Sequence, residues 1–571
     1  MIATTRRFRV RLFGVGVLAA AAGWLLAGST GYGWHGAGLV AGGLLTSVGT
    51  VWARWRPPTG SRRLIGRWDR RSRRHQGTAS RWDIWHTSSR TAMRRRAGVL
   101  RPSLRVASWW TRWTAPVLSY ATPLCRVGAA TVWTSCEEST LRVGIPGTGK
   151  TAELACRVAD APGGVVVTST AADIFDLTAP LRRRRGPVFV FNPGGIGAVT
   201  STLRWSPLSG CADPAVATRR AADLMGPPGG SAEGERWDVQ GRRVLAVFLH
   251  AAALGGHRMR DVQAWVANPD AGRVQILAAL AGSPQPAEMR QAAEHAIATT
   301  PRTRDGVMLA IARAVSWVTL PAAAATGDPG PAEAGMFTVA DLTDKAGALY
   351  LLGDDDGTVA PLVAALVAEI AYQARHLAAG RPGGRLDPAL TLALDEIALV
   401  CPTPLDRWMA ELRKRSIVIH AACQGLGQLR HRWGADGASM ILNSAAAVLV
   451  FGGCKDPTDL QTFGTLSGQR DEDTHTWNPD GRRTATTTRP VPVIAPAMLA
   501  GLPNHRALLI RRGMPVALAK TPVAWRRRDV RRATTAEARA ARAVVRAAER
   551  AARNGLGARL LRRRQPTSTR T

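Results

Sequence analysis

Two apolar stretches separated by a short glycine-rich segment open the chain. Residues 12–53 comprise 42 positions without a single Asp, Glu, Lys or Arg. One helix of that length would measure about 63 Å, twice the thickness of a hydrocarbon core of about 30 Å. The interruption at Gly28–Gly33 favours two spans, at residues 12–28 and 36–52, joined by a tight loop. We therefore predict an N-terminal two-helix transmembrane hairpin.

The charges around this pair predict its orientation. Arginines flank both outer ends, whereas the short loop has none. By the positive-inside rule, both termini are cytoplasmic and the protein is a multi-pass protein of the inner (cytoplasmic) membrane. The alternative is a cleaved signal peptide, with Arg6–Arg11 as its basic region. A second apolar span follows at once, so we favour the hairpin.

Beyond residue 138 the pattern changes to short, nearly continuous apolar runs, which are typical of strands buried on both faces. Such runs occupy residues 139–143, 164–169, 187–191, 390–394, 416–424 and 446–451. Helical segments separate several of them, which predicts an α/β fold with a mostly parallel sheet and ligands at the carboxyl ends of its strands. Residues 209–339 are rich in alanine and lack strand-like alternation, which favours helices.

Composition and charge change the picture mainly at the ends of the chain. Hydrophobic residues make up 46% and charged residues 20%, which excludes wholesale disorder. Seven scattered cysteines without a C-x-x-C pair argue against a disulfide scaffold and a zinc ribbon. The net charge of +35 is concentrated in residues 6–11, 54–112 and 526–571, which leaves only +4 for residues 113–525. Electrostatic partners are therefore expected at the flanks.

The basic flanks suggest two kinds of partner. Residues 57–137 form an Arg/Trp-rich juxtamembrane segment, which we expect to lie on the anionic headgroups of the lipid membrane, at roughly 1 kcal/mol per charge. Nucleic-acid contact is the alternative for this segment. The basic tail, residues 526–571, contains a candidate exposed helix at 536–553 and is expected to be partly disordered before it binds DNA, lipid or a protein.

The strongest local signal is the sequence Gly-Ile-Pro-Gly-Thr-Gly-Lys-Thr, a complete G-x-x-x-x-G-K-[ST] between a predicted strand and a predicted helix. Phosphates need a concave ring of backbone N–H groups at a helix N-terminus, and glycines let the chain turn that tightly. The chain has only five lysines against 71 arginines, so a chance lysine at the required position is improbable. The predicted ATP-binding residues are Gly144, Gly147, Thr148, Gly149, Lys150 and Thr151.

Carboxylates at the end of a later strand complete this site. Lys150 is expected to reach the β- and γ-phosphates, and Thr151 to hold Mg²⁺ together with Asp395. Glu396 is the predicted catalytic residue that polarises the attacking water. Gln424, at the end of another strand, is placed to sense the γ-phosphate; its alternative is a polar residue at a helix N-terminus.

Several further stretches occur in a recognisable order. They are residues 165–169, 173–178, 186–193, 205–208, Leu-Asp-Glu at 394–396, Arg-Lys-Arg-Ser at 413–416, Cys-Gln-Gly-Leu-Gly-Gln-Leu at 423–429, 433–434, 441–443 and 451–453. With the hairpin and the glycine-rich loop, this set resembles the conjugative coupling proteins of type IV secretion, the TraG/TraD-like branch of the FtsK-related P-loop ATPases. The resemblance covers most of residues 1–525. It departs at Thr170–Asp173, where a basic residue is common, and at Phe191–Pro193, where Phe-Asp-Pro is usual.

The resemblance implies more than the residues alone. It implies a RecA-like ATPase domain that carries an inserted all-α domain and assembles into a homo-hexameric ring with ATP sites between subunits. A head-to-tail contact that closes on itself produces such a ring. An arginine from the neighbouring subunit then stabilises charge on the transferring phosphoryl group. By position, Arg413 is the catalytic candidate, with Arg415 second.

These inferences predict one organisation and one leading function. The domains are a transmembrane hairpin (1–56), the juxtamembrane segment (57–137), the ATPase domain (138–208 and 340–525), the all-α domain (209–339) and the tail (526–571). The function is an ATP-hydrolysing DNA translocase, or coupling protein, that delivers DNA with a relaxase-type protein to the proteins of a secretion channel. The alternatives are an ATP-regulated docking receptor for secreted proteins and an FtsK-like pump for double-stranded DNA.

Overall fold

The structure is a computed structural model that describes residues 40–41, 77–227, 232–330, 337–354, 356–478 and 483–563. The chain divides into two compact units, residues 1–68 and 69–571, and nearly all described residues belong to the second. Apart from Val40 and Ala41, the predicted hairpin lies outside the described residues. Within the described part, no single helix is long and apolar enough to cross a bilayer, although one bent pair, Pro301–Thr319 with Pro321–Gly327, reaches the required length and composition.

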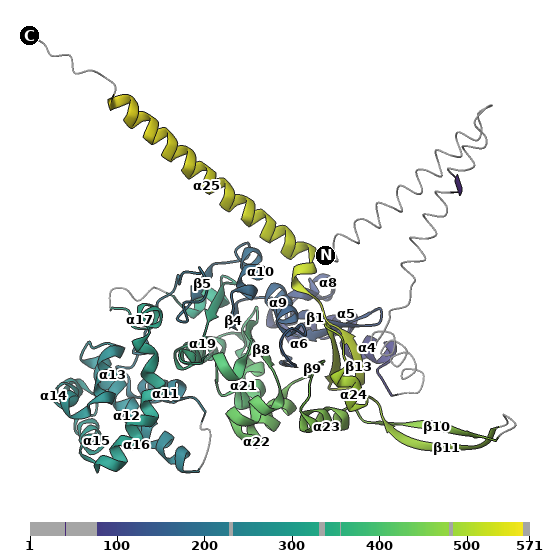
Figure 1. Ribbon diagram of the computed structural model, residues 1–571, viewed down its shortest axis with the longest axis horizontal. Helices are drawn as coiled ribbons and strands as arrows, with labels where there is room; N and C mark the ends of the chain where they lie inside the picture. Colours follow the sequence, from purple (N-terminus) through teal and green to yellow (C-terminus); the bar gives the residue numbers. More distant parts are fainter. Residues whose placement is uncertain are drawn as a thin grey trace, which may run out of the picture. The chain divides into compact units, whose positions relative to one another are not determined.

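A single large sheet organises the second unit (Figure 1). Eleven strands of the described residues pair in the order β2-β1-β13-β12-β9-β3-β8-β7-β4-β6-β5. The strands from β9 to β5 are parallel, and the other four extend the sheet in antiparallel fashion. Their bounds are β1 Ala121–Val127, β2 Ala130–Ser135, β3 Thr140–Val143, β4 Val165–Ser169, β5 Val188–Phe191, β6 Ala348–Leu352, β7 Leu390–Leu394, β8 Ile417–Cys423, β9 Ala447–Phe451, β12 Arg506–Arg511 and β13 Met514–Lys520.

The predicted α/β fold with a mostly parallel sheet is confirmed. The six apolar runs of the sequence are strands β3, β4, β5, β7, β8 and β9, and β6 was not predicted. Every residue of β4, β6, β7, β8 and β9 is buried, because helices cover both faces of the parallel part. This burial explains why their sequences are continuously apolar and show no alternation.

The direction of each crossover along the sheet determines which face its helix covers. Helices α9 (Lys150–Asp160) and α10 (Asp173–Arg182) connect strands in one direction along the sheet, while α19 (Ala360–Ala379), α21 (Leu405–Glu411) and α22 (Leu426–Ser444) connect them in the other. Right-handed crossovers therefore put the two groups on opposite faces, as Figure 1 shows.

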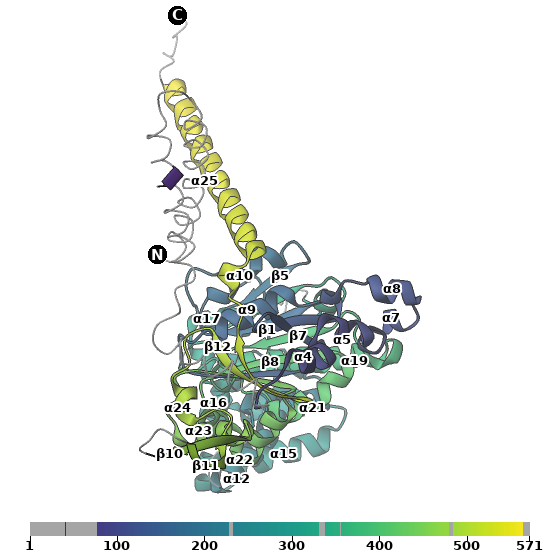
Figure 2. The ribbon, with the colours of Figure 1, turned by 90° about the vertical axis from the view of Figure 1, so that its right-hand side faces the viewer.

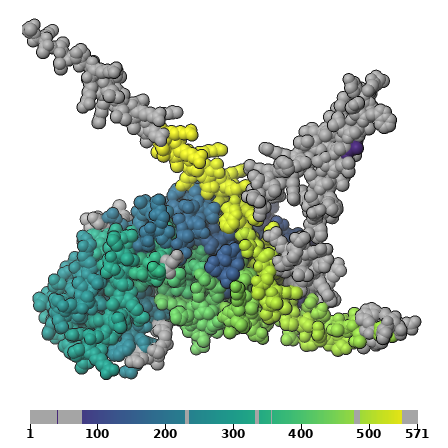
Figure 3. Space-filling model, in the orientation of Figure 1, coloured from purple at the N-terminus to yellow at the C-terminus, as the bar shows by residue number. Residues whose placement is uncertain are grey.

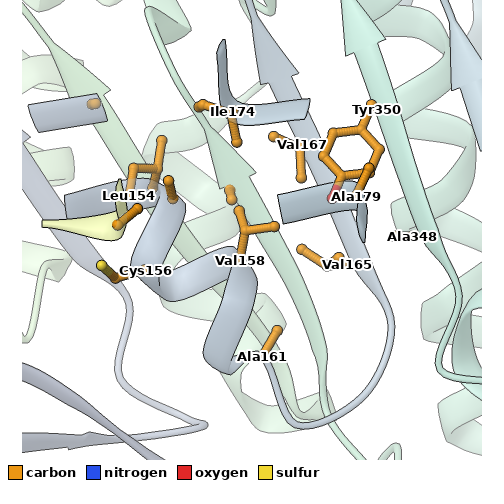
Figure 4. Close-up of a cluster of buried hydrophobic side chains, with 14 residues drawn as sticks. Leu154, Cys156, Val158, Ala161, Val165, Val167, Ile174, Ala179, Ala348 and Tyr350 are labelled. Atoms are coloured by element: carbon orange, nitrogen blue, oxygen red, sulfur yellow. The ribbon is translucent and has the colours of Figure 1, made fainter. Parts of the chain in front are cut away.

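A buried apolar cluster packs α9 and α10 onto the strands. Figure 4 shows Val158 of α9 beside Val165 of β4, and Leu154 and Cys156 of the same helix belong to the same buried cluster. At about 25 cal/mol per Å² of buried apolar surface, each such side chain contributes roughly 1.5–3 kcal/mol to folding. The cluster fixes the helix that begins at the glycine-rich loop against the sheet.

Helices alone occupy the described residues between β5 and β6, and they lie together as the teal region of Figure 3. Their bounds are α11 Pro214–Met225, α12 Ala232–Leu254, α13 Met259–Ala267, α14 Pro269–Ala279, α15 Pro286–Ala298, α16 Pro301–Val315, α17 Pro321–Gly327 and α18 Val339–Thr343. Five of them begin with proline at the first turn, where the missing N–H has no intrahelical partner to lose. This strand-free stretch overlaps the predicted all-α domain, whose boundaries remain a prediction.

The remaining elements come from the two ends of the chain. They are α4 Arg81–Ser88, α5 Arg90–Arg95, α6 Ala97–Leu100, α7 Pro102–Arg105, α8 Trp109–Thr114, the ribbon of β10 Gln469–Trp477 and β11 Arg483–Pro492, α20 Ile397–Val400, α23 Pro457–Leu466, α24 Pro496–Ala500 and α25 Arg528–Arg563. Two findings differ from the predicted organisation. Strands β1 and β2 precede the predicted boundary at residue 138 and nevertheless pair with the main sheet. Helix α25 is longer than the predicted helix at 536–553.

Candidate nucleotide-binding site

The loop between β3 and α9 has a backbone that only glycine adopts without strain. Gly147 and Gly149 have φ angles of +79° and +109°. A Cβ atom at Gly144 would lie 2.6 Å from Cβ of Phe451 on the neighbouring strand β9. The loop therefore turns tightly from a central strand into α9, whose first N–H groups have no partner within the helix. Such a helix start is suited to binding phosphate.

Lys150, the first residue of α9, is buried, and its side chain lies against the backbone of this loop. Its Nζ donates hydrogen bonds to the carbonyl oxygens of Gly144 and Ile145, at 2.5 Å and 3.2 Å. It also lies 3.9 Å from Oε1 of Glu396. The ammonium group is thus held over the loop by main-chain oxygens and a carboxylate, where phosphate oxygens can replace these partners.

Thr151 and Asp395, separated by 243 residues in the chain, are in direct contact. The Thr151 hydroxyl donates a hydrogen bond of 2.9 Å to Oδ2 of Asp395. Asp395 follows β7 and is 3% exposed. Burial raises the pKa of Asp395 to about 6, although the hydrogen bond from Thr151 acts in the opposite direction. A hydroxyl and a carboxylate oxygen at this distance are hard ligands of the kind that Mg²⁺ prefers.

Glu396 and Gln424 complete the cluster. Glu396 has a left-handed φ of +43°, and its side chain is 15% exposed. Such a conformation is costly for a residue with a side chain and is typical of functional positions. Gln424, which follows β8, donates from Nε2 to Oε2 of Glu396 at 3.3 Å. Since β3, β8 and β7 are neighbours, their carboxyl ends bring these side chains to one edge of the sheet.

A buried ionic cluster lies behind the loop and was not predicted. Glu153 of α9 forms ion pairs with Arg142 of β3 and with Arg157 of α9, the latter at 3.0 Å, and all three side chains are fully buried. Arg142 also donates to the Thr140 hydroxyl at 2.8 Å. The cluster ties the strand before the loop to the helix after it. An arginine inside an apolar strand, followed by a glutamate on the next helix, is the sequence signal that could have revealed it.

His505 supports the other side of the loop and also escaped prediction. Its backbone N–H donates to the carbonyl oxygen of Thr148 at 2.9 Å. A Cβ atom at Gly149 would lie only 2.5 Å from Nδ1 of His505, so the imidazole packs directly on this glycine. The His505 ring also meets that of Trp525 edge to face, with centroids 5.9 Å apart. No local motif marks this residue, because its position depends on the pairing of β12 with β9.

Arg413 is not brought to this cluster. It lies in the short 3₁₀ helix Leu412–Arg415, which precedes β8, and its side chain is exposed. The nucleotide cluster is at the carboxyl ends of the strands, so Arg413 is at the opposite edge of the sheet from the site of its own chain. Its neighbour Arg415 donates to the carbonyl oxygen of Gly384 at 3.2 Å.

The residues at the cluster suit a nucleotide with Mg²⁺ better than a protein-only metal site. No group of three or more His, Cys, Asp or Glu side chains gathers within the described ranges. A Mg²⁺ ion held by one or two protein oxygens and by phosphate oxygens needs no such group. Thr151 and Asp395 supply those protein oxygens, and the loop supplies the N–H donors and the lysine.

Comparison with known proteins finds a family match for part of this arrangement. Residues 389–504 match the family model described as the TraM recognition site of TraD and TraG. The predicted TraG/TraD resemblance is confirmed. The matched TraG/TraD segment contains Asp395, Glu396 and Gln424, together with the β10–β11 ribbon. No curated protein sequence matches the chain.

Solved structures of a conjugative coupling protein share the fold of this chain. The unbound bacterial conjugative coupling protein TrwBdeltaN70 superposes with a TM-score of 0.54 at 20% identity, over 72% of this chain and 91% of that chain. TrwB in complex with ADP and Mg²⁺ gives 0.53 at 19% identity, over 70% and 90%. TrwB with a non-hydrolysable ATP analogue gives 0.52 at 19% identity, over 70% and 89%. At this identity, the likeness shows the fold.

Proposed function

We propose that this protein is an ATP-hydrolysing coupling protein of the inner membrane, which moves DNA with a relaxase-type protein to a type IV secretion channel. The observation that carries the proposal is the meeting of the glycine-rich loop with the end of β7. Thr151 contacts Asp395 at 2.9 Å and Lys150 lies 3.9 Å from Glu396, although the sequence separates these pairs by more than 240 residues. The TraG/TraD match over residues 389–504 supports the coupling role.

The side chains have distinct roles in this mechanism. The N–H groups at the start of α9 and the Lys150 ammonium bind the phosphates of ATP. Thr151 and Asp395 would hold Mg²⁺, which when bound neutralises phosphate charge. Glu396 orients the attacking water and withdraws its proton as the new O–P bond forms and the bond to ADP breaks. Gln424 holds the Glu396 carboxylate in place until the γ-phosphate is present.

The last part of the proposal concerns how the subunits assemble and what role this gives to Arg413. Because Arg413 lies at the opposite edge of the sheet from its own site, it can act only on the site of another subunit. A homo-hexameric ring in which Arg413 of one subunit reaches the ATP of the next satisfies this condition. Arginines that act in this way raise phosphoryl-transfer rates by about 10³–10⁵.

The membrane part of the proposal rests on the sequence. The uncharged residues 12–53 would form the two-span anchor with both termini in the cytoplasm. The membrane-anchored protein would then contact the channel proteins and the relaxase-type partner at the membrane surface.

A Lys150→Ala substitution tests the ATPase directly. We expect hydrolysis to fall by at least about 100-fold, because the phosphates lose a charged partner in a partly buried site. The detergent needed to extract the protein from membranes should not change. Lys345→Ala is the matched control, since Lys345 is 68% exposed and pairs with Asp341 away from the cluster. Normal turnover of Lys150→Ala would remove the assigned site.

The docking receptor remains the second candidate function, because the matched family segment is described as a recognition site for a partner protein. DNA distinguishes the two functions. For the translocase, DNA should stimulate hydrolysis by the full chain, and rising salt should weaken this effect steeply because phosphate contacts release counterions. Hydrolysis that does not respond to DNA anywhere between about 50 and about 300 mM salt would favour the receptor.

A further inference from the structure

Five tryptophans are exposed on the short helices that precede β1. Trp82 and Trp85 of α4 are 67% and 41% exposed. Trp109, Trp110 and Trp113 of α8 are 67%, 66% and 37% exposed. Tryptophan is usually well buried, and a contiguous exposed apolar patch of this kind marks an interaction site.

Arginines of α5 join the two tryptophan groups into one surface, which we call the Trp/Arg surface. The Arg95 guanidinium lies 5.0 Å from the Trp85 ring centroid, and Arg94 lies 5.6 Å from that of Trp113. Trp82 stacks on Trp85 at 5.4 Å, and Trp109 stacks on Trp113 at 6.2 Å. Helices α4, α5, α7 and α8 are found at the right of Figure 2.

Helices α5 and α6, which lie between the two tryptophan groups in the sequence, are anchored in the apolar core, whereas α8 itself has no buried residue. Met93 of α5 and Leu100 of α6 are buried with Tyr120 in a common apolar cluster. Arg101 pairs with Asp387 at 2.6 Å, which ties the segment to the residues before β7. The helices therefore present the tryptophans outward on a fixed base.

The charge of the surface is predominantly positive. Residues 77–115 contain eight arginines and a single acid, Asp83. Arg96 and Arg101 are paired with Glu138 and Asp387. The other six have no acidic partner among the residues that the structure describes; they are Arg81, Arg90, Arg94, Arg95, Arg105 and Arg112.

We infer that the Trp/Arg surface docks the ATPase unit on an anionic lipid bilayer. Tryptophan rings partition to the level of the headgroups, and arginines attract the anionic lipids there. The segment begins 24 residues after the uncharged residues 12–53, so a linker of that length connects it to the proposed membrane anchor. Trp82 stacks on Trp85 and Trp109 on Trp113, so these rings form compact apolar pairs. Stacking of single-stranded DNA bases on the remaining ring faces is the alternative that the test below distinguishes. The inference deepens the proposed membrane location and does not depend on ATP hydrolysis.

The test uses the full chain in two kinds of nanodisc, one of phosphatidylcholine and one containing phosphatidylglycerol. Hydrogen–deuterium exchange of the peptides that cover α4, α5 and α8 is measured in both. We expect exchange to slow on the order of tenfold in the anionic discs, since several arginines gain lipid partners at once. The double variant Trp109→Ser/Trp110→Ser and the charge variant Arg81→Glu/Arg105→Glu should each lose most of this protection. Trp525→Ser, which removes an exposed tryptophan outside this surface, should keep it.

Two results would overturn the inference. One is equal exchange of these peptides in neutral and anionic discs. The other is protection by added single-stranded DNA in neutral discs without any effect of the anionic lipid, which would make the surface a nucleic-acid site. ATP hydrolysis by the same sample separates the two proposals: a chain with lipid-protected α8 and no hydrolysis would keep the docking surface and remove the motor.

Discussion

Two regions of the unit place a carboxylate in opposite surroundings. Behind the glycine-rich loop, Glu153 is fully buried between Arg142 and Arg157. At the junction of the inserted helices with α19 and α22, the half-buried Asp223 of α11 faces cavities of about 320 Å³ and 290 Å³, and its Oδ2 accepts no hydrogen bond from the described residues. Burial raises the pKa of Asp223 to about 7. The first carboxylate is compensated and closely packed, and the second is neither.

The difference indicates which region is rigid and which can rearrange. A compensated ion cluster between β3 and α9 would hold the glycine-rich loop in one geometry before a nucleotide binds, as the proposed hydrolysis requires. Cavities and an unpaired carboxylate lower the cost of shifting the inserted helices against the sheet. We therefore expect conformational change during turnover at the junction, and little change at the loop.

The largest expected effect concerns Glu396, whose substitution should reduce ATP hydrolysis without changing the stability of the fold. Glu396→Gln should lower kcat by about 10²–10⁴, because the amide cannot withdraw the proton of the attacking water. ATP binding and the unfolding temperature should stay close to those of the unchanged chain. Steady-state hydrolysis and thermal unfolding check this, with the exposed Glu411→Gln as control. A kcat within threefold of the unchanged chain would contradict the role of Glu396, given the size of the effect expected of a general base.

The next effect concerns the ion cluster itself. Glu153→Ala should reduce the free energy of unfolding by about 3–5 kcal/mol, because it leaves two buried guanidinium groups without their shared carboxylate. Denaturant unfolding of the full chain measures the loss. Glu537→Ala, which removes an exposed pair with Arg183, should cost less than about 1 kcal/mol. The triple variant Arg142→Met/Glu153→Leu/Arg157→Met should recover much of the stability. Equal losses for the buried and the exposed pair would contradict the proposed role of the cluster.

The smallest effect depends on pH and concerns the junction. The folded chain holds the Asp223 proton more tightly than the unfolded chain, since burial raises its pKa from 3.8 to about 7. The contribution of this group to stability therefore falls as the pH rises from about 4 to 7. Asp223→Asn removes the charge, so it should be about 1–2 kcal/mol more stable than the unchanged chain at pH 8 and about equal to it at pH 4.

Thermal unfolding at both pH values measures this difference. The exposed Asp436→Asn is the control, and it should show no such dependence on pH. A stabilisation by Asp223→Asn that is the same at pH 4 and pH 8 would show that burial does not perturb this carboxyl.

The sequence alone determined the local parts of the site. The glycines, Lys150 and Thr151 are contiguous, and their order already encodes a phosphate loop, because backbone sterics at glycine act between near neighbours. The strand that ends in Asp395 and Glu396 was recognisable since a strand buried on both faces must be apolar throughout. The membrane hairpin and the tail were likewise predicted from local composition.

Only the tertiary structure decided which distant residues meet. The strand order β3-β8-β7 brings Thr151 to Asp395, and the opposite end of β8 separates Arg413 from them. The antiparallel pairing of β12 with β9 brings His505 to Gly149. Such contacts depend on sheet topology and side-chain packing over more than 240 residues, and no period or motif along the chain carries that information.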